Sequence, residues 1–121
     1  MASSSDTVLV VEDEPIIRMV AVEALEDAGF STVEFGTAEE AIAFCASGEQ
    51  EIAAIFTDIN MPGDLDGLDL VSVVSRAQPH VAVVISSGRY QERPADLPHK
   101  AVFLPKPWRA PDLIAAIRSR T

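Results

Sequence analysis

The stretch VLVVEDEP at residues 8–15 decides the fold, because it joins a buried strand to the start of a helix. Residues 8–11 are apolar and mostly β-branched, which is typical of a strand covered on both faces of a parallel sheet. Three acidic residues follow at once, and Pro15 then stands where its fixed φ angle suits the first turn of a helix. The sequence therefore predicts a strand whose carboxyl end carries acidic side chains.

The alternation of strand and helix continues along the chain. Apolar runs and helical spacing predict further strands over residues 31–35, 52–57, 81–85 and 101–104, and helices over 15–28, 38–47, 68–76 and from 111 onward. Gly29 is expected to end the first helix, and Thr37 with Glu40 is expected to form a capping box at the second. Alternating units with short connections imply an α/β fold, with a five-stranded parallel sheet and helices on both faces.

The segment between the last two strands departs from this pattern. Pro94 and Pro98 leave room for at most one short or irregular helix in residues 89–100. No linker or internal repeat is visible, so residues 7–121 are expected to form one domain after a disordered tail of residues 1–6. That tail lacks the basic and apolar regions of a secretory signal.

Composition excludes several classes of protein. The chain has 121 residues, of which 48% are hydrophobic, and this suffices for one core of normal size. A net charge of −10 argues against nucleic-acid binding, and no apolar run reaches the ~18 residues of a membrane helix. The single cysteine, Cys45, cannot form an internal disulfide, so a cytoplasmic protein is expected. Acids are concentrated in residues 1–60, which hold 13 acidic residues and one basic residue, Arg18.

Charged and polar side chains follow four of the predicted strands. Because the carboxyl ends of parallel strands meet at one edge of the sheet, the residues directly after them are expected to lie together. These residues are Glu12, Asp13, Asp58, Ser87 and Lys106. Each alone is ordinary for a solvated loop, but together they supply three carboxylates, a hydroxyl and an ammonium group.

Such a cluster has a defined chemistry. Two carboxylates ~4 Å apart repel by about 4 kcal/mol at an effective dielectric of 20, so converging acids need a cation. An oxygen-only donor set suits Mg²⁺, and His80 and His99 lie elsewhere in the pattern. A carboxylate can also attack phosphorus and hold the phosphoryl group as an acyl phosphate, whose charge Mg²⁺ and Lys106 would neutralise.

Four separated segments carry a family resemblance. Residues 10–15, 57–62, 85–88 and 103–107 resemble, in order, the motifs of the receiver domain of two-component response regulators. The resemblance covers residues 7–120 and is closest in kind to stand-alone, single-domain receivers. It implies a flavodoxin-like fold with strand order 2-1-3-4-5.

The resemblance also implies roles for the clustered residues. Asp58 matches the phosphoacceptor, and Glu12 and Asp13 match the acidic pair, with Asp13 the more direct Mg²⁺ ligand. The main-chain carbonyl of Asn60 would be a further ligand beside Asp58. Lys106 matches the lysine that pairs with the phosphoryl group, and its bond to the following proline is expected to be cis.

Two further residues match the switch positions of the family. Ser87 would move toward the phosphoryl group, and Phe103 would turn inward behind it. This motion biases a surface made by the fourth helix, the fifth strand and the fifth helix. Arg89 and Asn60 are expected to border the path of the attacking water and to tune the lifetime of the phosphoryl group.

Three features depart from the common family pattern. The loop of residues 61–67 is one residue longer, Gly88 stands where alanine is more usual, and the proline-broken segment 89–98 replaces a regular fourth helix. The third departure affects the output surface.

The expected function is a phosphoacceptor switch and not an enzyme acting on a separate substrate. A histidine kinase or a histidine phosphotransfer protein would donate the phosphoryl group, and the domain would catalyse only this transfer and its own slow hydrolysis. Output would pass through contact with a further protein, without nucleic acid or membrane. Basic residues in the expected output segments are Arg89, Arg93, Lys100, Arg109, Arg118 and Arg120.

Three other functions remain open at this point. A phosphatase with an aspartyl nucleophile would need an acid where Asn60 stands. A flavodoxin-type binding module would need a glycine- and hydroxyl-rich loop in place of residues 12–14. A receiver-like domain that is never phosphorylated would not need the acids and Lys106.

Overall fold

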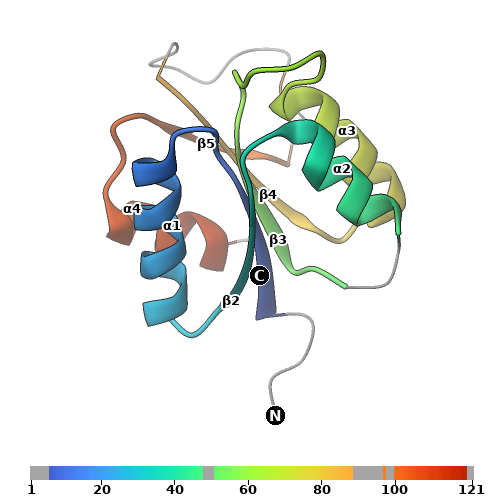
Figure 1. Ribbon diagram of the computed structural model, residues 1–121. Helices are drawn as coiled ribbons and strands as arrows, with labels where there is room; N and C mark the ends of the chain where they lie inside the picture. The colour runs from blue at the N-terminus through green and yellow to red at the C-terminus, as the bar shows by residue number, and fades with distance from the viewer. Residues whose placement is uncertain (1–5, 48–50, 89–96, 98–99, 120–121) are drawn as a thin grey trace.

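A computed structural model describes residues 6–47, 51–88, 97 and 100–119 (Figure 1). Five parallel strands form one sheet in the order β2-β1-β3-β4-β5, as expected. Their bounds are β1 Thr7–Val11, β2 Ser31–Phe35, β3 Ala54–Asp58, β4 Ala82–Ser87 and β5 Val102–Pro105. The helices of the described part are α1 Pro15–Asp27, α2 Ala38–Ala46, α3 Gly67–Ala77 and α4 Ala110–Arg118.

The helices form two layers around the sheet. Figure 1 shows α1 and α4 on one face and α2 and α3 on the other. Neighbouring strand residues alternate between these layers, so that Leu9 and Ile55 join one buried cluster while Val10 and Phe56 join the other. All four side chains are at most 2% exposed, which explains why the sequence of β1 is continuously apolar. None of the helices in the described ranges has the length and apolar run needed to cross a bilayer.

The ends of the helices follow local sequence signals. Pro15 occupies the first turn of α1, and Gly29, with a φ of 99°, follows its C-cap, as expected. The Thr37 hydroxyl accepts from the Glu40 N–H, but the Glu40 carboxylate bonds the Thr37 hydroxyl and not its N–H. The predicted capping box is therefore only half formed. A complete box of Asp66 and Asp69 begins α3 and was not predicted.

Strand bounds differ from the prediction for reasons of pairing. Ile52 is buried, but its N–H donates to the Gln78 side chain at 3.3 Å and not to a strand neighbour. Main-chain pairing begins with the Ala53 N–H, which donates to the Thr7 carbonyl at 2.8 Å, and β3 itself begins at Ala54. At the other end β3 includes Asp58, which pairs with Ser86. β4 likewise extends to Ser87. Asp58 and Ser87, which were expected just beyond their strands, thus belong to the strands themselves.

The helix α4 corresponds to the fifth helix of the family pattern. The prediction of an irregular fourth helix falls mostly on residues 89–96 and 98–99, which lie outside the described residues, as does Gly48. Leu97 between them is buried against the core shared with α2 and α3. Residues 1–5 of the expected tail also lie outside, and Asp6 directly precedes β1.

Candidate functional site

The acidic residues predicted to converge do so at the carboxyl edge of the sheet. Glu12 and Asp13 follow β1, and Asp58 ends β3, the strand beside it. Carboxylate oxygens of these three residues lie within 4.8 Å of one another. Glu12 is 1% exposed and Asp58 7%, so their charges are largely removed from water. The repulsion expected from the sequence is therefore present.

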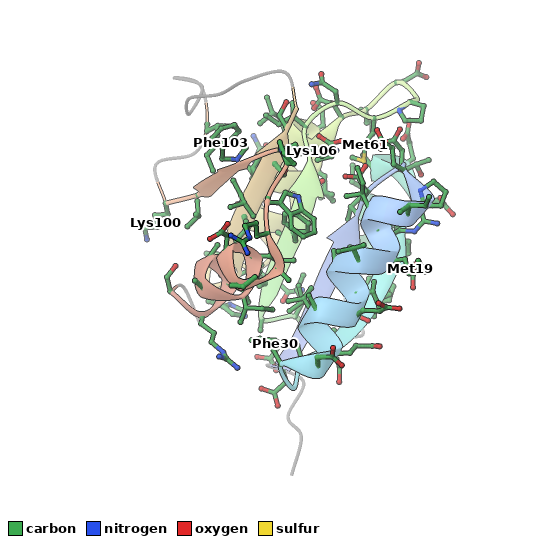
Figure 2. All side chains as sticks on the ribbon, turned by 90° about the vertical axis from the view of Figure 1, so that its left-hand side faces the viewer. Met19, Phe30, Met61, Lys100, Phe103 and Lys106 are labelled. Atoms are coloured by element: carbon green, nitrogen blue, oxygen red, sulfur yellow. The ribbon has the colours of Figure 1, made fainter. Side chains whose placement is uncertain are left out.

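Lys106 supplies a positive charge inside this cluster. Its Nζ lies 2.8 Å from Glu12 Oε1 and 2.9 Å from Asp58 Oδ2. The Lys106 N–H donates to the Ser87 carbonyl at 3.0 Å, which ties the residue after β5 to the end of β4. Its bond to Pro107 is cis, as expected. Figure 2 shows the Lys106 side chain at this edge of the molecule.

Burial shapes the ionisation of the pair. The pKa of Glu12 is raised to about 7, mainly because burial disfavours the charged form, and the charge of Asp58 adds to the rise. The hydrogen bonds from Lys106 and from the Glu14 N–H, and the charge of Lys106, oppose it. Burial lowers the pKa of Lys106, but hydrogen bonds and charges of Glu12 and Asp58 outweigh this and raise it overall. Lys106 therefore keeps its positive charge. The Glu12 carboxylate is the group that a second cation nearby would stabilise most.

Arg18 supports the cluster from α1 and was not predicted as a site residue. Its Nη1 donates to the Glu12 carbonyl at 2.8 Å and its Nε to Glu34 Oε1 at 3.1 Å. The Glu12 N–H donates to the Phe35 carbonyl at 3.1 Å. Both main-chain groups of Glu12 are thereby fixed. The only signal in the sequence was that Arg18 is the single basic residue in residues 1–60.

The predicted switch and tuning residues are placed as follows. Ser87 is fully buried at the end of β4, next to the strand of Asp58. Phe103 is partly buried on β5 and packs on the core shared with α2 and α3. Asn60 is exposed two residues after Asp58, and Arg89 lies outside the described residues.

The residues of this cluster fit a hard divalent cation. All donors are oxygens, and the Asp13 carboxylate has no hydrogen bond or ion pair within the described chain. Among the residues that the structure describes, the cysteine and the histidine lie elsewhere, since Cys45 is buried on α2 and His80 faces Glu51 at 4.0 Å. Mg²⁺ is the cation that this donor set favours.

Comparison with known proteins assigns the family. The description "Response regulator receiver domain" belongs to the family model that matches residues 8–118. The chain belongs to this family. Receiver domains are phosphoacceptor switches of two-component signalling and not enzymes with a separate substrate, which answers the phosphatase alternative.

Curated relatives include proteins much longer than this chain and one of similar length. Sensor kinase CckA of Brucella abortus (strain 2308) is 31% identical over 121 residues, which are 96% of this chain and 12% of CckA. NtrX of Azorhizobium caulinodans is 39% identical over 82 residues, or 67% of this chain and 18% of NtrX. The receiver protein CpdR of Brucella abortus is 29% identical, with 91% of this chain and 92% of CpdR covered. The chain thus spans a small part of the first two.

Solved structures share the fold. A response regulator receiver protein from Sinorhizobium medicae WSM419 has a TM-score of 0.84 at 28% identity, covering 94% of this chain and 92% of that one. TrrA from Thermotoga maritima, in complex with Mg²⁺ and BeF, has a TM-score of 0.82 at 25% identity, covering 95% of this chain and 98% of its own. Both support the receiver fold of this chain.

Proposed function

We propose that Asp58 is the phosphoacceptor of this receiver domain, which spans residues 7–121. The observation that carries the proposal is the shared contact of Lys106 with Glu12 and Asp58 beside a third carboxylate, Asp13. This arrangement places the Asp58 carboxylate beside the Lys106 ammonium group, which can contact an incoming phosphoryl group. A histidine kinase or a histidine phosphotransfer protein is the donor, and the transfer takes place in the cytoplasm.

The transfer requires little of the protein beyond placement and charge. An oxygen of Asp58 forms a bond to phosphorus, the bond from phosphorus to the donor imidazole nitrogen breaks, and the electron pair stays on that nitrogen. Lys106 exchanges one of its two carboxylate contacts for a phosphoryl oxygen. Glu12 keeps the other contact, so that the ammonium group stays in place through the reaction.

Mg²⁺ would be held by Asp13, Asp58 and the main-chain carbonyl of Asn60, with Glu12 close by. When bound, the ion neutralises the negative charge that the phosphoryl group brings to the acids. TrrA, which shares the fold, carries Mg²⁺ and BeF in its crystal structure, and this supports a magnesium site in the present domain.

Switching and slow hydrolysis complete the proposal. Ser87, buried on the neighbouring strand, donates to the phosphoryl group, and Phe103 follows it toward the core. Asn60 and Arg89 tune the attack of water on the acyl phosphate, by which the domain returns to its resting state. The β5 and α4 side then meets the downstream protein.

The donor docks beside the acidic edge, where α1 carries unusual apolar exposure. Ile16, Met19 and Val20 are 73%, 53% and 43% exposed. A hollow of about 200 Å³ between this face and residues 106–108 connects the apolar side chains to Lys106. Met19 and Lys106 are labelled in Figure 2. An exposed apolar patch beside a reactive group suits a helical partner that presents a histidine.

Intact mass spectrometry tests the proposal. Wild-type protein incubated with acetyl phosphate or phosphoramidate should gain about 80 Da with Mg²⁺ and far less with EDTA. The Asp58→Asn variant, which is of nearly equal size, should gain nothing. A wild-type protein without added mass, or a variant with as much as the wild type, would refute Asp58 as phosphoacceptor.

A further inference from the structure

The loop between β3 and α3 is held by a side chain from another helix. This loop carries Asn60 and is the one that is a residue longer than in the common family form. Glu39, in the first turn of α2, directs Oε2 to the loop and accepts from the Asp64 N–H at 2.9 Å and the Leu65 N–H at 3.3 Å. One carboxylate thus satisfies two main-chain donors of a segment 25 residues away.

The loop is shaped to receive this carboxylate. Gly63 has a φ of 109°, a conformation that side chains rarely adopt. A Cβ atom at Gly63 would lie 2.6 Å from Glu39 Oε2 and 2.9 Å from Oε1. The backbone angle favours glycine at this position, and any other residue would in addition displace the Glu39 carboxylate.

Glu39 makes these contacts as an anion. Its own N–H lowers the pKa of the carboxyl group, burial opposes this, and the Leu65 and Asp64 N–H groups lower it further. Bonds from N–H groups to a carboxylate are stronger than those between neutral groups. Oε1 of Glu39 is buried and, within the described chain, has no hydrogen bond, so the Oε2 contacts alone hold the group in place.

The far end of the loop is fixed independently. Asp66 caps α3, and the Gly67 N–H donates to the Ile59 carbonyl at 2.9 Å. The Ile59 N–H donates to the Ser86 carbonyl at 3.0 Å, so the near end is fixed as well, and Glu39 acts on the span between Ile59 and Asp66. That span contains Asn60, whose carbonyl belongs to the proposed metal site.

We propose that Glu39 is a positioning residue, which fixes the lengthened loop after Asp58 and thereby the main chain of Asn60. Removing its carboxylate weakens Mg²⁺ binding and changes the lifetime of the phosphoryl group, although Glu39 touches neither. The effect on Mg²⁺ rests on the proposed function, whereas the hold on the loop does not. Outer residues that orient metal ligands commonly change affinity by about tenfold or more.

Two measurements on the Glu39→Ala variant test this inference. Hydrogen exchange of the metal-free protein should show faster exchange of the Asp64 and Leu65 amides, by about tenfold, with no change in β3. Calorimetric titration with MgCl₂ should show an affinity about tenfold lower. The control is Glu23→Ala, which removes the same charge from an exposed position on α1.

The outcomes separate this inference from the proposed function. Unchanged exchange at Asp64 and Leu65 would overturn the role of Glu39, and so would faster exchange with an Mg²⁺ affinity equal to that of the control. If the wild-type protein itself fails to bind Mg²⁺, the proposed metal site and the expected effect on Mg²⁺ affinity are both wrong. The exchange data still decide whether Glu39 holds the loop.

A second variant tests the same contact from the side of the loop. Gly63→Ala should displace Glu39 by steric overlap and speed exchange at the same two amides. In the Glu39→Ala background the added methyl group has no carboxylate to displace, so its effect on exchange should shrink. Equal effects in both backgrounds would contradict the contact between Gly63 and Glu39.

Discussion

Gly67 lies directly against the main chain of Asp58. A Cβ atom added at Gly67 would overlap the Asp58 carbonyl oxygen and lie 2.9 Å from its carbonyl carbon. The Gly67 N–H meanwhile donates to the Ile59 carbonyl at 2.9 Å. The first residue of α3 therefore packs against the main chain at the end of β3. This contact restricts the main chain of Asp58, the proposed phosphoacceptor.

Gly67→Ala is expected to destabilise the domain strongly, because backbone atoms and not a flexible side chain occupy the space. The free energy of unfolding should fall by about 2–4 kcal/mol, as measured by urea unfolding. Gly88→Ala is the matched control, since a Cβ there would meet only the Lys106 side chain at 3.7 and 3.8 Å. Similar stability of the two variants would show that the Asp58 main chain can shift at little cost in free energy.

Sequence reasoning reached the fold and the acidic edge because both depend on local patterns. The apolar run of β1 and the acids after it are contiguous in the sequence. Because the strands are parallel, their carboxyl ends meet at one edge of the sheet and bring these acids together with the residues at the ends of the other strands. The contacts of Arg18 with Glu12 and of Glu39 with the loop were not predicted. Each joins segments whose relative position is set by packing, and an exposed-looking charge on a helix gives no sign of its partner.

Asp13→Asn is expected to stabilise the metal-free protein. The Asp13 carboxylate adds a third negative charge within 4.8 Å of Glu12 and Asp58, and Lys106 contacts only those two. Removing that charge should raise the free energy of unfolding by about 1–2 kcal/mol, in EDTA and at low salt. Thermal melts by circular dichroism measure this directly.

Mg²⁺ should reverse the order of stability. The wild type gains stability from a bound ion, whereas Asp13→Asn lacks a proposed ligand and should gain little. Asp112→Asn provides a control, because it removes an equal charge from the first turn of α4, away from the cluster. If Asp13→Asn were less stable than the wild type in the absence of metal, this would contradict repulsion between the Asp13 carboxylate and the other two.

The raised pKa of Glu12 predicts a dependence of stability on pH. In the folded, metal-free protein the pKa is about 7, against an ordinary value of 4.5, so the unfolded state releases its proton first. The stabilisation is fully present below pH 4.5 and is lost as pH rises to about 7. This contribution to the free energy of unfolding amounts to about 3 kcal/mol at most.

Glu12→Gln isolates this contribution. The difference in unfolding free energy between wild type and variant should change across pH 4.5–7 and stay level above it. Saturating Mg²⁺ should flatten the wild-type curve, because a cation favours the carboxylate. A difference that is constant with pH would mean that Glu12 ionises normally in the folded protein.

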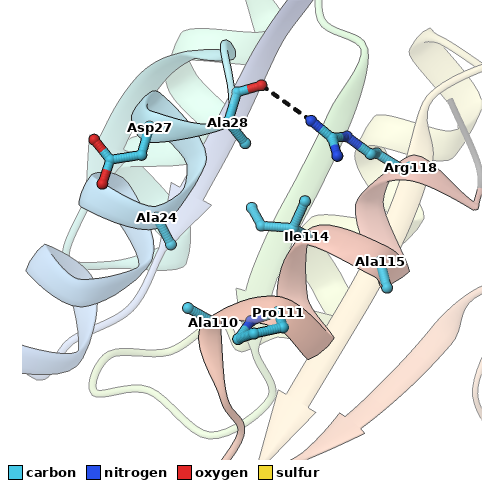
Figure 3. Close-up of a pocket in the computed structure, with 8 residues that line it drawn as sticks. All are labelled: Ala24, Asp27, Ala28, Ala110, Pro111, Ile114, Ala115 and Arg118. Carbon is cyan, nitrogen blue, oxygen red and sulfur yellow. Dashed lines mark hydrogen bonds between the residues drawn. The ribbon is translucent and has the colours of Figure 1, made fainter.

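Arg118 compensates for the charge at the end of α1 (Figure 3). Its Nη2 donates to the carbonyl of Ala28, the C-cap of α1, at 3.2 Å. The last turn of α1 has no basic residue and includes Asp27, whose charge is unfavourable beside free carbonyl groups. Arg118, expected above to face a partner, thus also binds within the domain.

Arg118→Met is therefore expected to lower the free energy of unfolding by about 0.5–1 kcal/mol, since the contact is exposed. Arg118→Lys should recover part of the loss, because it keeps the charge near the helix end. Lys100→Met serves as the control, as it removes the same charge from an exposed position. Urea unfolding at low and high salt measures all three, and a loss no larger than that of Lys100→Met would exclude a capping role for Arg118.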